Sequence, residues 1–157
     1  PDCFSIIGLA REAAATFRKP FNMPKIQVVE EDKTMDNMID IEIKNYDICP
    51  RYTCRIIEDV KIEPSPQWLR HRLTSAGIRP INNIVDITNY VMLELGQPMH
   101  AYNYDKIEGK KLIVRNANKG EKLVTLDGIE REFDETVLVI QDENKLVDLA
   151  GIMGGKF

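Results

Sequence analysis

The stretch from Ala76 to Tyr102 contains residue types that could act together on a polar ligand. It holds His100, one of the two histidines of the chain, and several amide and hydroxyl side chains that interrupt an apolar run. Those polar residues are Asn82, Asn83, Thr88, Asn89 and Gln97. A buried amide without a hydrogen-bond partner costs about 1–3 kcal/mol. These groups must therefore either bond one another in a core or line a polar pocket, and both interpretations stay open at this point.

The reactive side chains form no pattern typical of a covalent nucleophile. No Ser-His-Asp or Cys-His arrangement is evident, and Cys49 and Cys54 have no histidine near them in the sequence. His71 lies between two arginines on a predicted helix, so we expect it to be exposed and do not assign it to a site. We therefore expect no covalent mechanism.

Composition predicts an ordinary globular protein. The 157 residues are 43% hydrophobic and 29% charged. The net charge of −4 does not favour a domain that binds RNA without a neighbouring domain. A domain that receives an RNA end from a neighbour stays possible. The three cysteines lack metal-ligand spacing, so we expect reduced thiols in a cytoplasmic protein and no zinc. No run is apolar enough for a membrane span. The terminal residues suggest a piece of a longer protein.

Two helices are predicted before residue 78. The first covers residues 2–17, with Asp2 as its cap and an apolar stripe formed by Ile6, Leu9, Ala10, Ala13 and Phe17. The second covers residues 66–76: Ser65 is the expected N-cap, Pro66 suits the first helical position, and Gly77 suits a left-handed C-terminal cap.

A third helix is predicted over residues 84–95, within the polar stretch. Asn82 or Asn83 can cap it, and Gly96 ends it. Its expected buried side carries Ile84, Ile87, Val91 and Leu95. Thr88 borders that side, and Gln97 to His100 follow the last turn.

Strands account for most of the remaining chain. Asp127-Gly128 lies between two alternating runs, which is the strongest short-range signal of a β-hairpin. The predicted strands are residues 38–43, 52–60, 111–115, 122–126, 129–133, 136–141 and 145–149, and a glycine-dense segment, residues 150–155, follows them. Glycines there suit either a tight turn or a close approach of backbone to a ligand.

Four motifs in register carry a family resemblance. PSPQWLRHRL, AGIRPINNIVDITNYVMLELGQPMHAY, GEKLVTLDGIER and LAGIMGG stand in this order. Together they closely resemble the B3/B4 region of the β subunit of bacterial phenylalanyl-tRNA synthetase, and the opening PDCFSIIGLARE resembles the helix that precedes it. The resemblance implies an α+β fold with layered mixed β-sheets and helices packed on one side, after an N-terminal helix. It also implies a division into residues 1–38, the helix and connector of the preceding domain, and residues 39–157, a B3/B4-like domain that continues beyond Phe157.

The function that the resemblance implies is editing. In that family, the β subunit belongs to a ligase that charges tRNA with phenylalanine, and the B3/B4 region hydrolyses tyrosine wrongly attached to the tRNA. The implied partners are the 3′ end of tRNA(Phe), a tyrosine or phenylalanine ester, and a synthetase α subunit in a heterotetramer. The implied setting is the cytoplasm, away from membranes. ATP and Mg²⁺ would serve the whole enzyme, and no cofactor is implied for this region.

The family's editing pocket maps onto six positions of this chain. Thr88, Asn89 and His100 would act in catalysis, while Arg79, Pro98 and Gly154 would bind the substrate. The resemblance therefore predicts that these residues converge on one pocket. The family also uses a glutamate beyond Phe157 to recognise the tyrosine hydroxyl.

A second hypothesis gives the same region a different role. In it, the chain is a structural module that braces the subunit and contacts tRNA without chemistry. A lone histidine is more commonly structural than catalytic, and only the motif match favours catalysis. A pocket wall shared by Thr88, His100 and Gly154 would favour editing, and a filled core there would favour bracing.

Overall fold

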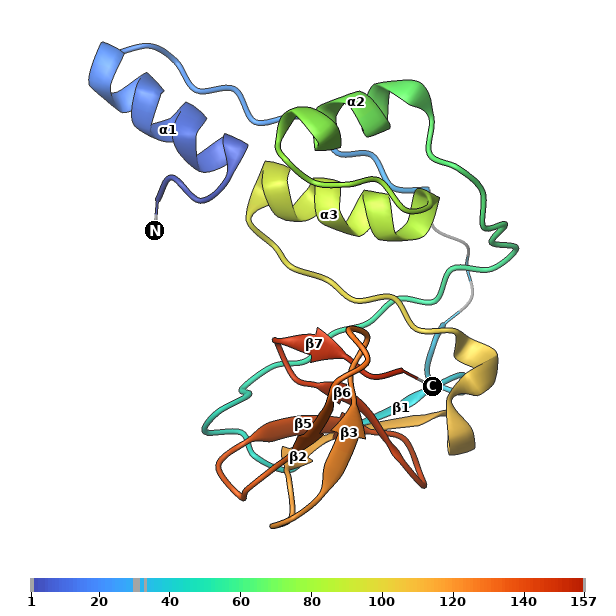
Figure 1. The fold of residues 1–157 in the computed structure, drawn as a ribbon. Coiled ribbons are helices and arrows are strands. Elements are labelled where there is room, and N and C mark those ends of the chain that lie inside the picture. Colours follow the sequence, from blue (N-terminus) through green and yellow to red (C-terminus); the bar gives the residue numbers. More distant parts are fainter. Residues whose placement is uncertain (1, 30–31, 33, 157) are drawn as a thin grey trace. The chain divides into compact units, whose positions relative to one another are not determined.

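A computed structural model describes residues 2–29, 32 and 34–156, which fold as two compact units. Unit 1 comprises residues 1–31 and 59–101, and unit 2 comprises residues 32–58 and 102–157. The three α-helices of the described chain belong to unit 1 and its β-strands belong to unit 2 (Figure 1). The predicted α+β class, with a mixed sheet and an N-terminal helix, is confirmed. The packing of helices on one side of the sheets and the division at residue 38 stay predictions.

Helix α1 (Ile6–Phe17) begins later than predicted. Ser5 caps it, because its Oγ accepts a hydrogen bond from the Gly8 amide at 3.0 Å, so the prediction of Asp2 as the cap is wrong. The predicted apolar stripe is also wrong. The buried residues are Ile7 and Gly8, at the end of the helix that contacts α3, whereas Leu9 and Phe17 are exposed.

Helices α2 (Gln67–Ser75) and α3 (Asn83–Leu95) pack against each other. The Asn82 side chain caps α3 by accepting from the Val85 amide at 3.0 Å, and Gly96 ends it in the left-handed region, so both predictions are confirmed. Ile87 is 48% exposed, so its predicted burial is wrong. Within α3 the buried residue is Asp86, because this carboxylate has partners inside unit 1.

Asp86 bonds two segments that precede it in the chain. Its carboxylate accepts from the Ser65 hydroxyl at 2.5 Å and from the Ile81 amide at 2.8 Å. The prediction that Ser65 caps α2 is therefore wrong: Pro66 occupies the cap position, and the Ser65 hydroxyl is buried against Asp86. One carboxylate thus joins the start of α2, the loop between the helices and the first turn of α3.

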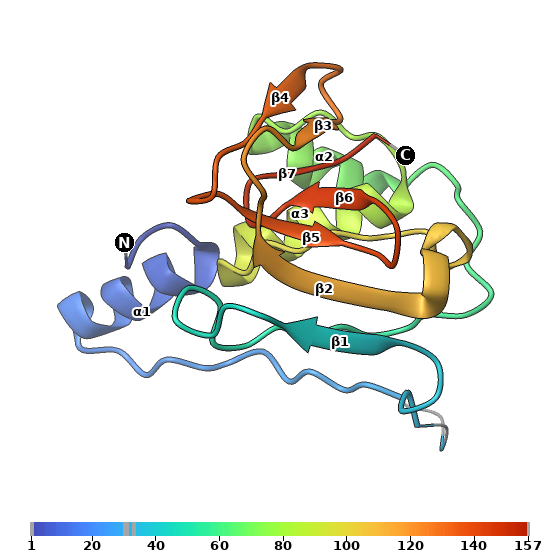
Figure 2. The same ribbon diagram turned by 90° about the horizontal axis from the view of Figure 1, so that it is seen from below.

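The larger sheet of unit 2 has the strand order β1-β2-β5-β6-β7 (Figure 2). Strand β1 (Asp40–Ile43) is parallel to β2 (Lys111–Asn116), and β5 (Leu138–Gln141), β6 (Leu146–Leu149) and β7 (Met153–Gly154) continue it with antiparallel pairings. Two short 3₁₀ helices, η1 (Tyr104–Lys106) and η2 (Glu108–Lys110), lead into β2.

The predicted hairpin at Asp127-Gly128 is confirmed. Strands β3 (Lys122–Val124) and β4 (Glu130–Glu132) pair antiparallel around it. The predicted strand over residues 52–60 is wrong, since this segment has no regular secondary structure. Instead, Tyr52 packs against the cluster of buried residues formed by Ile107, Leu112, Val114, Ile140 and Val147. Ile57 and Val60 are 74% and 45% exposed, so burial against the sheet accounts for Tyr52 but not for the other apolar residues of the segment.

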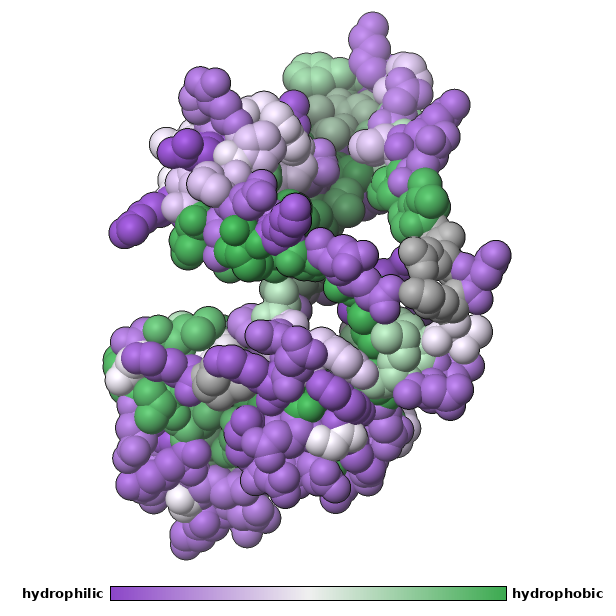
Figure 3. All heavy atoms as spheres, turned by 90° about the vertical axis from the view of Figure 1, so that its right-hand side faces the viewer, coloured by the Kyte–Doolittle hydropathy of each residue, from purple (hydrophilic) through white to green (hydrophobic). Residues whose placement is uncertain are grey.

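The surface of unit 2 is mostly polar in the view of Figure 3, where hydrophilic residues cover most of its visible face. Among the described residues, none of the helices is long and apolar enough to cross a membrane.

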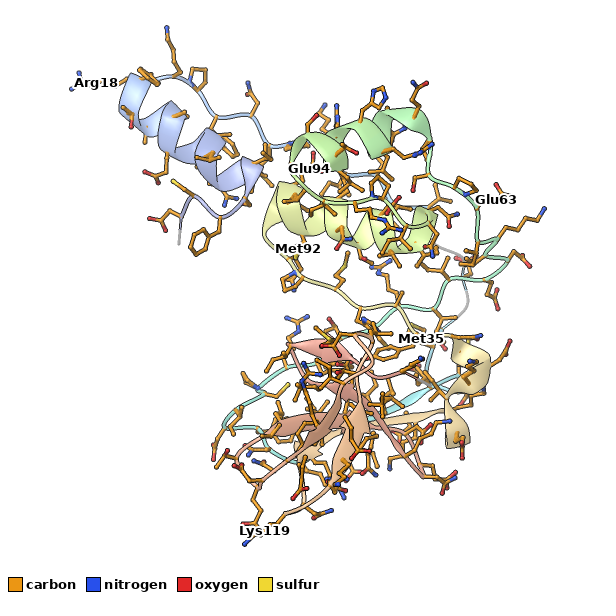
Figure 4. The ribbon with its side chains drawn as sticks, viewed as in Figure 1. Arg18, Met35, Glu63, Met92, Glu94 and Lys119 are labelled. Carbon is orange, nitrogen blue, oxygen red and sulfur yellow. The ribbon has the colours of Figure 1, made fainter. Side chains whose placement is uncertain are left out.

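The buried Asp86 generates a prediction about the stability of unit 1. Replacing Asp86 with Ala should lower the free energy of unfolding by about 2–4 kcal/mol, because the Ser65 hydroxyl and the Ile81 amide would lose their acceptor. Trp68 is the only tryptophan and lies on α2, so urea unfolding followed by its fluorescence reports on this unit. Glu63→Ala is the control, because the Glu63 side chain points outward (Figure 4). A loss below about 1 kcal/mol for Asp86→Ala would contradict the assigned role.

Candidate functional site

The two asparagines at the start of α3 have structural roles. Asn82 is the helix cap. The Asn83 amide donates to the Lys61 carbonyl at 2.8 Å, and its oxygen accepts from the Glu63 amide at 3.2 Å. These bonds attach the segment before α2 to α3. Two of the polar residues that the sequence places in this stretch therefore belong to the framework of unit 1.

Thr88 and Asn89 are different, because their side chains keep hydrogen-bonding capacity for a ligand. The Thr88 hydroxyl donates to the Val85 carbonyl at 2.8 Å, which leaves its oxygen able to accept. Asn89 is half-buried, and its amide makes no hydrogen bond to any residue that the structure describes. An amide in this state offers both donors and an acceptor to a bound molecule.

The face of α3 that carries Thr88 can be assigned within unit 1. Glu94 accepts a hydrogen bond from the Tyr90 hydroxyl at 3.0 Å, and Arg72 of α2 donates to the same hydroxyl, so this side of α3 faces α2. Met92 and Glu94 point to opposite sides of the helix (Figure 4). Thr88 lies four residues before Met92, about one helical turn. Thr88 is therefore on the side of α3 that faces away from α2.

The other predicted residues of unit 1 lie in loops. Arg79 is exposed in the loop between α2 and α3, and Pro98 and His100 are exposed in the segment after Gly96. The Gln97 side-chain amide donates to the Pro98 carbonyl at 3.1 Å, a bond between adjacent residues. A histidine exposed in a loop is accessible to substrate and water, as a residue that orients either one must be.

Gly154 belongs to unit 2, on strand β7 opposite Asp148 of β6. Its carbonyl accepts from the Leu126 amide at 2.9 Å, so a ligand oxyanion at this residue would need the N–H instead. A neighbouring glycine has a structural reason: a Cβ on Gly155 would lie 2.7 Å from the Val147 carbonyl oxygen. Gly151 adopts a φ of +71° in the turn before β7. The glycine density of this segment is thus explained in part by the hairpin itself.

The predicted site is divided between the two units. Arg79, Thr88, Asn89, Pro98 and His100 belong to unit 1, within a span of 22 residues, and Gly154 belongs to unit 2. The convergence of all six residues on one pocket stays a prediction.

A buried tyrosine–carboxylate cluster in unit 2 was missed by sequence reasoning. The Tyr102 hydroxyl donates to the Asp148 carboxylate, which is 5% exposed. Burial raises the pKa values of both Tyr102 and its neighbour Tyr52. No local pattern could reveal this contact, since 46 residues separate Tyr102 from Asp148. Tyr102 follows His100 by two residues in the sequence. Its partner, Asp148 of β6, is the residue that pairs with Gly154 of β7.

Two surface recesses lie outside the predicted site residues. One, of about 680 Å³, belongs to unit 2 and is lined by Lys44, Asn45, Tyr46, Asp47, Arg115, Asn116 and Asn118. Arg115 forms two bonds to Glu121, at 2.8 and 2.7 Å, and this guanidinium lowers the pKa of Glu121 to about 2. Its charge is therefore neutralised. The other recess, of about 330 Å³, belongs to unit 1 and lies along α2.

Comparison with known proteins identifies the family. Residues 48–157 match the model of the B3/4 domain, so the chain belongs to the B3/4 domain family. The phenylalanine–tRNA ligase beta subunit of Moorella thermoacetica is 50% identical over 154 residues, covering 98% of this chain and 19% of that protein. The corresponding subunit of Clostridium tetani is 49% identical over 156 residues, covering 99% of this chain and 20% of that protein. The chain thus spans about a fifth of the length of these relatives.

The tyrosine–carboxylate cluster generates a prediction about unit 2. Tyr102→Phe should lower the free energy of unfolding by about 1–2 kcal/mol, because the buried Asp148 carboxylate loses a hydrogen-bond donor. Amide hydrogen exchange of β5, β6 and β7 should speed up accordingly. Tyr46→Phe is the matched control, since Tyr46 is 63% exposed. Equal exchange rates in the two variants would show that the Tyr102 hydroxyl contributes nothing to the stability of the sheet.

Proposed function

We propose that this chain is part of the β subunit of a phenylalanine–tRNA ligase and that its region hydrolyses tyrosine from mischarged Tyr-tRNA(Phe). The proposal is supported by the family to which the chain belongs. It is also supported by two relatives that bear the name of that subunit and are 50% and 49% identical over 98% and 99% of this chain. An α subunit, tRNA(Phe), ATP and Mg²⁺ would complete the aminoacylating enzyme.

The observation that carries the editing proposal is the state of Asn89 on α3. Its amide is half-buried and makes no hydrogen bond to the described residues, next to a Thr88 hydroxyl that can still accept. None of the described side chains buries a nitrogen or oxygen atom without a hydrogen-bond partner, so the Asn89 amide is accessible from solvent and a ligand can reach it. Groups left open in this way suit a ligand that itself carries hydroxyl and ester oxygens.

A second site answers a specific problem of discrimination. An apolar synthetic pocket rejects an analogue with one extra hydroxyl only about 10²-fold. A site that hydrogen-bonds that hydroxyl can discriminate about 10⁴–10⁵-fold, because its polar groups stay unpaired with the correct amino acid. Tyrosine differs from phenylalanine by one such hydroxyl. Hydrolysis at a second site therefore supplies the selectivity that the first pocket lacks.

The proposed reaction is the attack of water on the ester carbonyl. The water oxygen forms a bond to the carbonyl carbon, and the bond to the ribose oxygen breaks. A proton from the water passes to the ribose oxygen, so that tyrosine and a tRNA with a free ribose hydroxyl are released. His100 would orient the water or the terminal ribose, and Thr88 and Asn89 would hold the ester. The Gly154 N–H would donate to the oxyanion, while Arg79 and Pro98 would bind the 3′ end.

The alternative is a module that braces the subunit and contacts tRNA without chemistry. The exposed positions of Arg79 and His100 are compatible with such contacts. The two functions differ in a single measurable respect: only the editing function requires His100 for hydrolysis.

Replacing His100 with Ala in the full-length ligase should slow the deacylation of Tyr-tRNA(Phe) by about 10²–10⁴-fold, as expected for a positioned acid–base or orienting group. Phenylalanine activation should stay near the parent rate, because it takes place at another site. Stability should change little, because His100 is exposed. Deacylation is measured with labelled Tyr-tRNA(Phe), and activation by pyrophosphate exchange.

Met99→Ala is the matched control, since it shortens the adjacent side chain of the same loop and should leave deacylation unchanged. A His100→Ala variant that unfolds early and still deacylates at the parent rate would identify His100 as structural. The bracing module would then be the better account.

A further inference from the structure

The recess along α2 has a regular chemical lining. It is formed by Gln67, Arg70, His71 and Thr74 of α2 and by Pro80 of the following loop, and its volume is about 330 Å³. The four helical residues follow the spacing i, i+3, i+4 and i+7, which places them on one face of the helix. Leu69 and Leu73 are buried on the opposite face. We call this recess the α2 groove.

The α2 groove lies in a locally basic part of an acidic chain. Residues 64–85 include three arginines and no aspartate or glutamate, whereas the chain as a whole carries a net charge of −4. The next acidic residue, Asp86, is 0% exposed and bonded to Ser65 and the Ile81 amide. No carboxylate lines the groove. An anion bound there would meet donors and positive charge without competition from a neighbouring acid.

The arginines of this segment are not equivalent. The Arg72 guanidinium lies over the rings of Trp68 and Tyr90 and donates to the Tyr90 hydroxyl, so it is engaged within unit 1. Arg70 forms no ion pair or hydrogen bond with the residues that the structure describes, and it is exposed. In the groove, Gln67 and His71 contact each other through their side-chain nitrogens at 3.4 Å. The Arg70 guanidinium is therefore able to donate its hydrogen bonds to a ligand.

We propose that the α2 groove binds the phosphate–ribose backbone of RNA, outside the site that hydrolyses the ester. Arg70 would contact a phosphate, and His71 would add a donor beside it. Gln67 and Thr74 carry groups that both donate and accept, which suits phosphate oxygens and the ribose 2′-hydroxyl. The donors extend over about 10 Å of helix. This arrangement fits an extended strand better than a compact free anion.

The position of the groove in the chain supports the same ligand. Pro80, which forms its wall, follows Arg79, a residue assigned to the 3′ end of the tRNA under the proposed function. An RNA strand held at Arg79 would thus pass residues adjacent to the groove. A membrane surface is a poorer fit, because attraction to anionic lipid is typical of clusters of about four to eight basic residues. The identity of the RNA as tRNA and the argument from Arg79 rest on the proposed function, whereas the argument from the lining of the groove does not.

The test uses the full-length protein that carries this chain and uncharged tRNA(Phe) as the probe. Binding is measured over a series of KCl concentrations. Arg70→Gln should weaken binding by about 5- to 10-fold at 0.1 M salt and reduce the slope of log K against log[salt] by about 0.9, the amount expected for one lost phosphate contact. The thermal stability of the full-length protein should be unchanged, because Arg70 is exposed.

Arg18→Gln is the matched control, because it removes the same charge from another exposed arginine of unit 1. Arg18 lies at the end of α1 and points outward (Figure 4). It should leave the slope unchanged. Equal effects of the two variants, or no effect of Arg70→Gln, would overturn the proposal.

Two further arms test the ligand class. The protein should bind vesicles containing phosphatidylserine no better when Arg70 is present than in Arg70→Gln, and inorganic phosphate at equal ionic strength should not displace the tRNA. An Arg70-dependent affinity for vesicles, or displacement by phosphate alone, would overturn the assignment to RNA. Uncharged tRNA contains no ester to hydrolyse, so these outcomes are independent of whether His100→Ala affects deacylation.

Discussion

The hydrogen bonds of the buried Asp86 carboxylate are the constraint on which unit 1 depends. A charged group that is 0% exposed is stable only when donors surround it. The Ser65 hydroxyl and the Ile81 amide supply these donors, and they come from opposite ends of α2. Because α3 begins just before Asp86, this carboxylate sets where α3 lies against α2. The residues of α3 and of the loop before it are positioned by the same contact.

Similar side chains on α3 therefore have different roles: some are bonded within unit 1, and others can bond a ligand. Asn82, Asn83 and Asp86 build the framework at the start of α3, whereas Thr88 and Asn89, two and three residues after Asp86, keep hydrogen-bonding capacity. The arginines of α2 show the same contrast. Arg72 donates to the Tyr90 hydroxyl within unit 1, whereas Arg70 forms no hydrogen bond with the described residues. In unit 2, the bond between Tyr102 and Asp148 fixes the chain close to β7. Framework contacts thus lie next to each group assigned to a ligand.

Local signals in the sequence were sufficient for some of these features. The cap at Asn82, the ends at Gly77 and Gly96 and the turn at Asp127-Gly128 depend on neighbours a few residues away, so they could be predicted. The role of Ser65 could not, because its partner is 21 residues distant and competes with a cap position that looked ideal. The segment from Tyr52 to Val60 has the composition of a strand but forms none: Tyr52 packs against the sheet, while Ile57 and Val60 are exposed. For α1, two apolar faces exist, and the sequence alone does not tell which one is covered.

The candidate site was predictable only as far as the family resemblance reached. Periodicity places Thr88 on a helix and His100 after its end, but nothing local distinguishes Asn89, which is open, from Asn83, which is bonded. The bond of Tyr102 to Asp148 is likewise a product of tertiary structure.

The most direct measurement of the central claim is single-turnover hydrolysis by the full-length protein without ATP, comparing Tyr-tRNA(Phe) with Phe-tRNA(Phe). The account predicts rapid release of tyrosine and slow release of phenylalanine, and release of both at the rate of the uncatalysed reaction would contradict it.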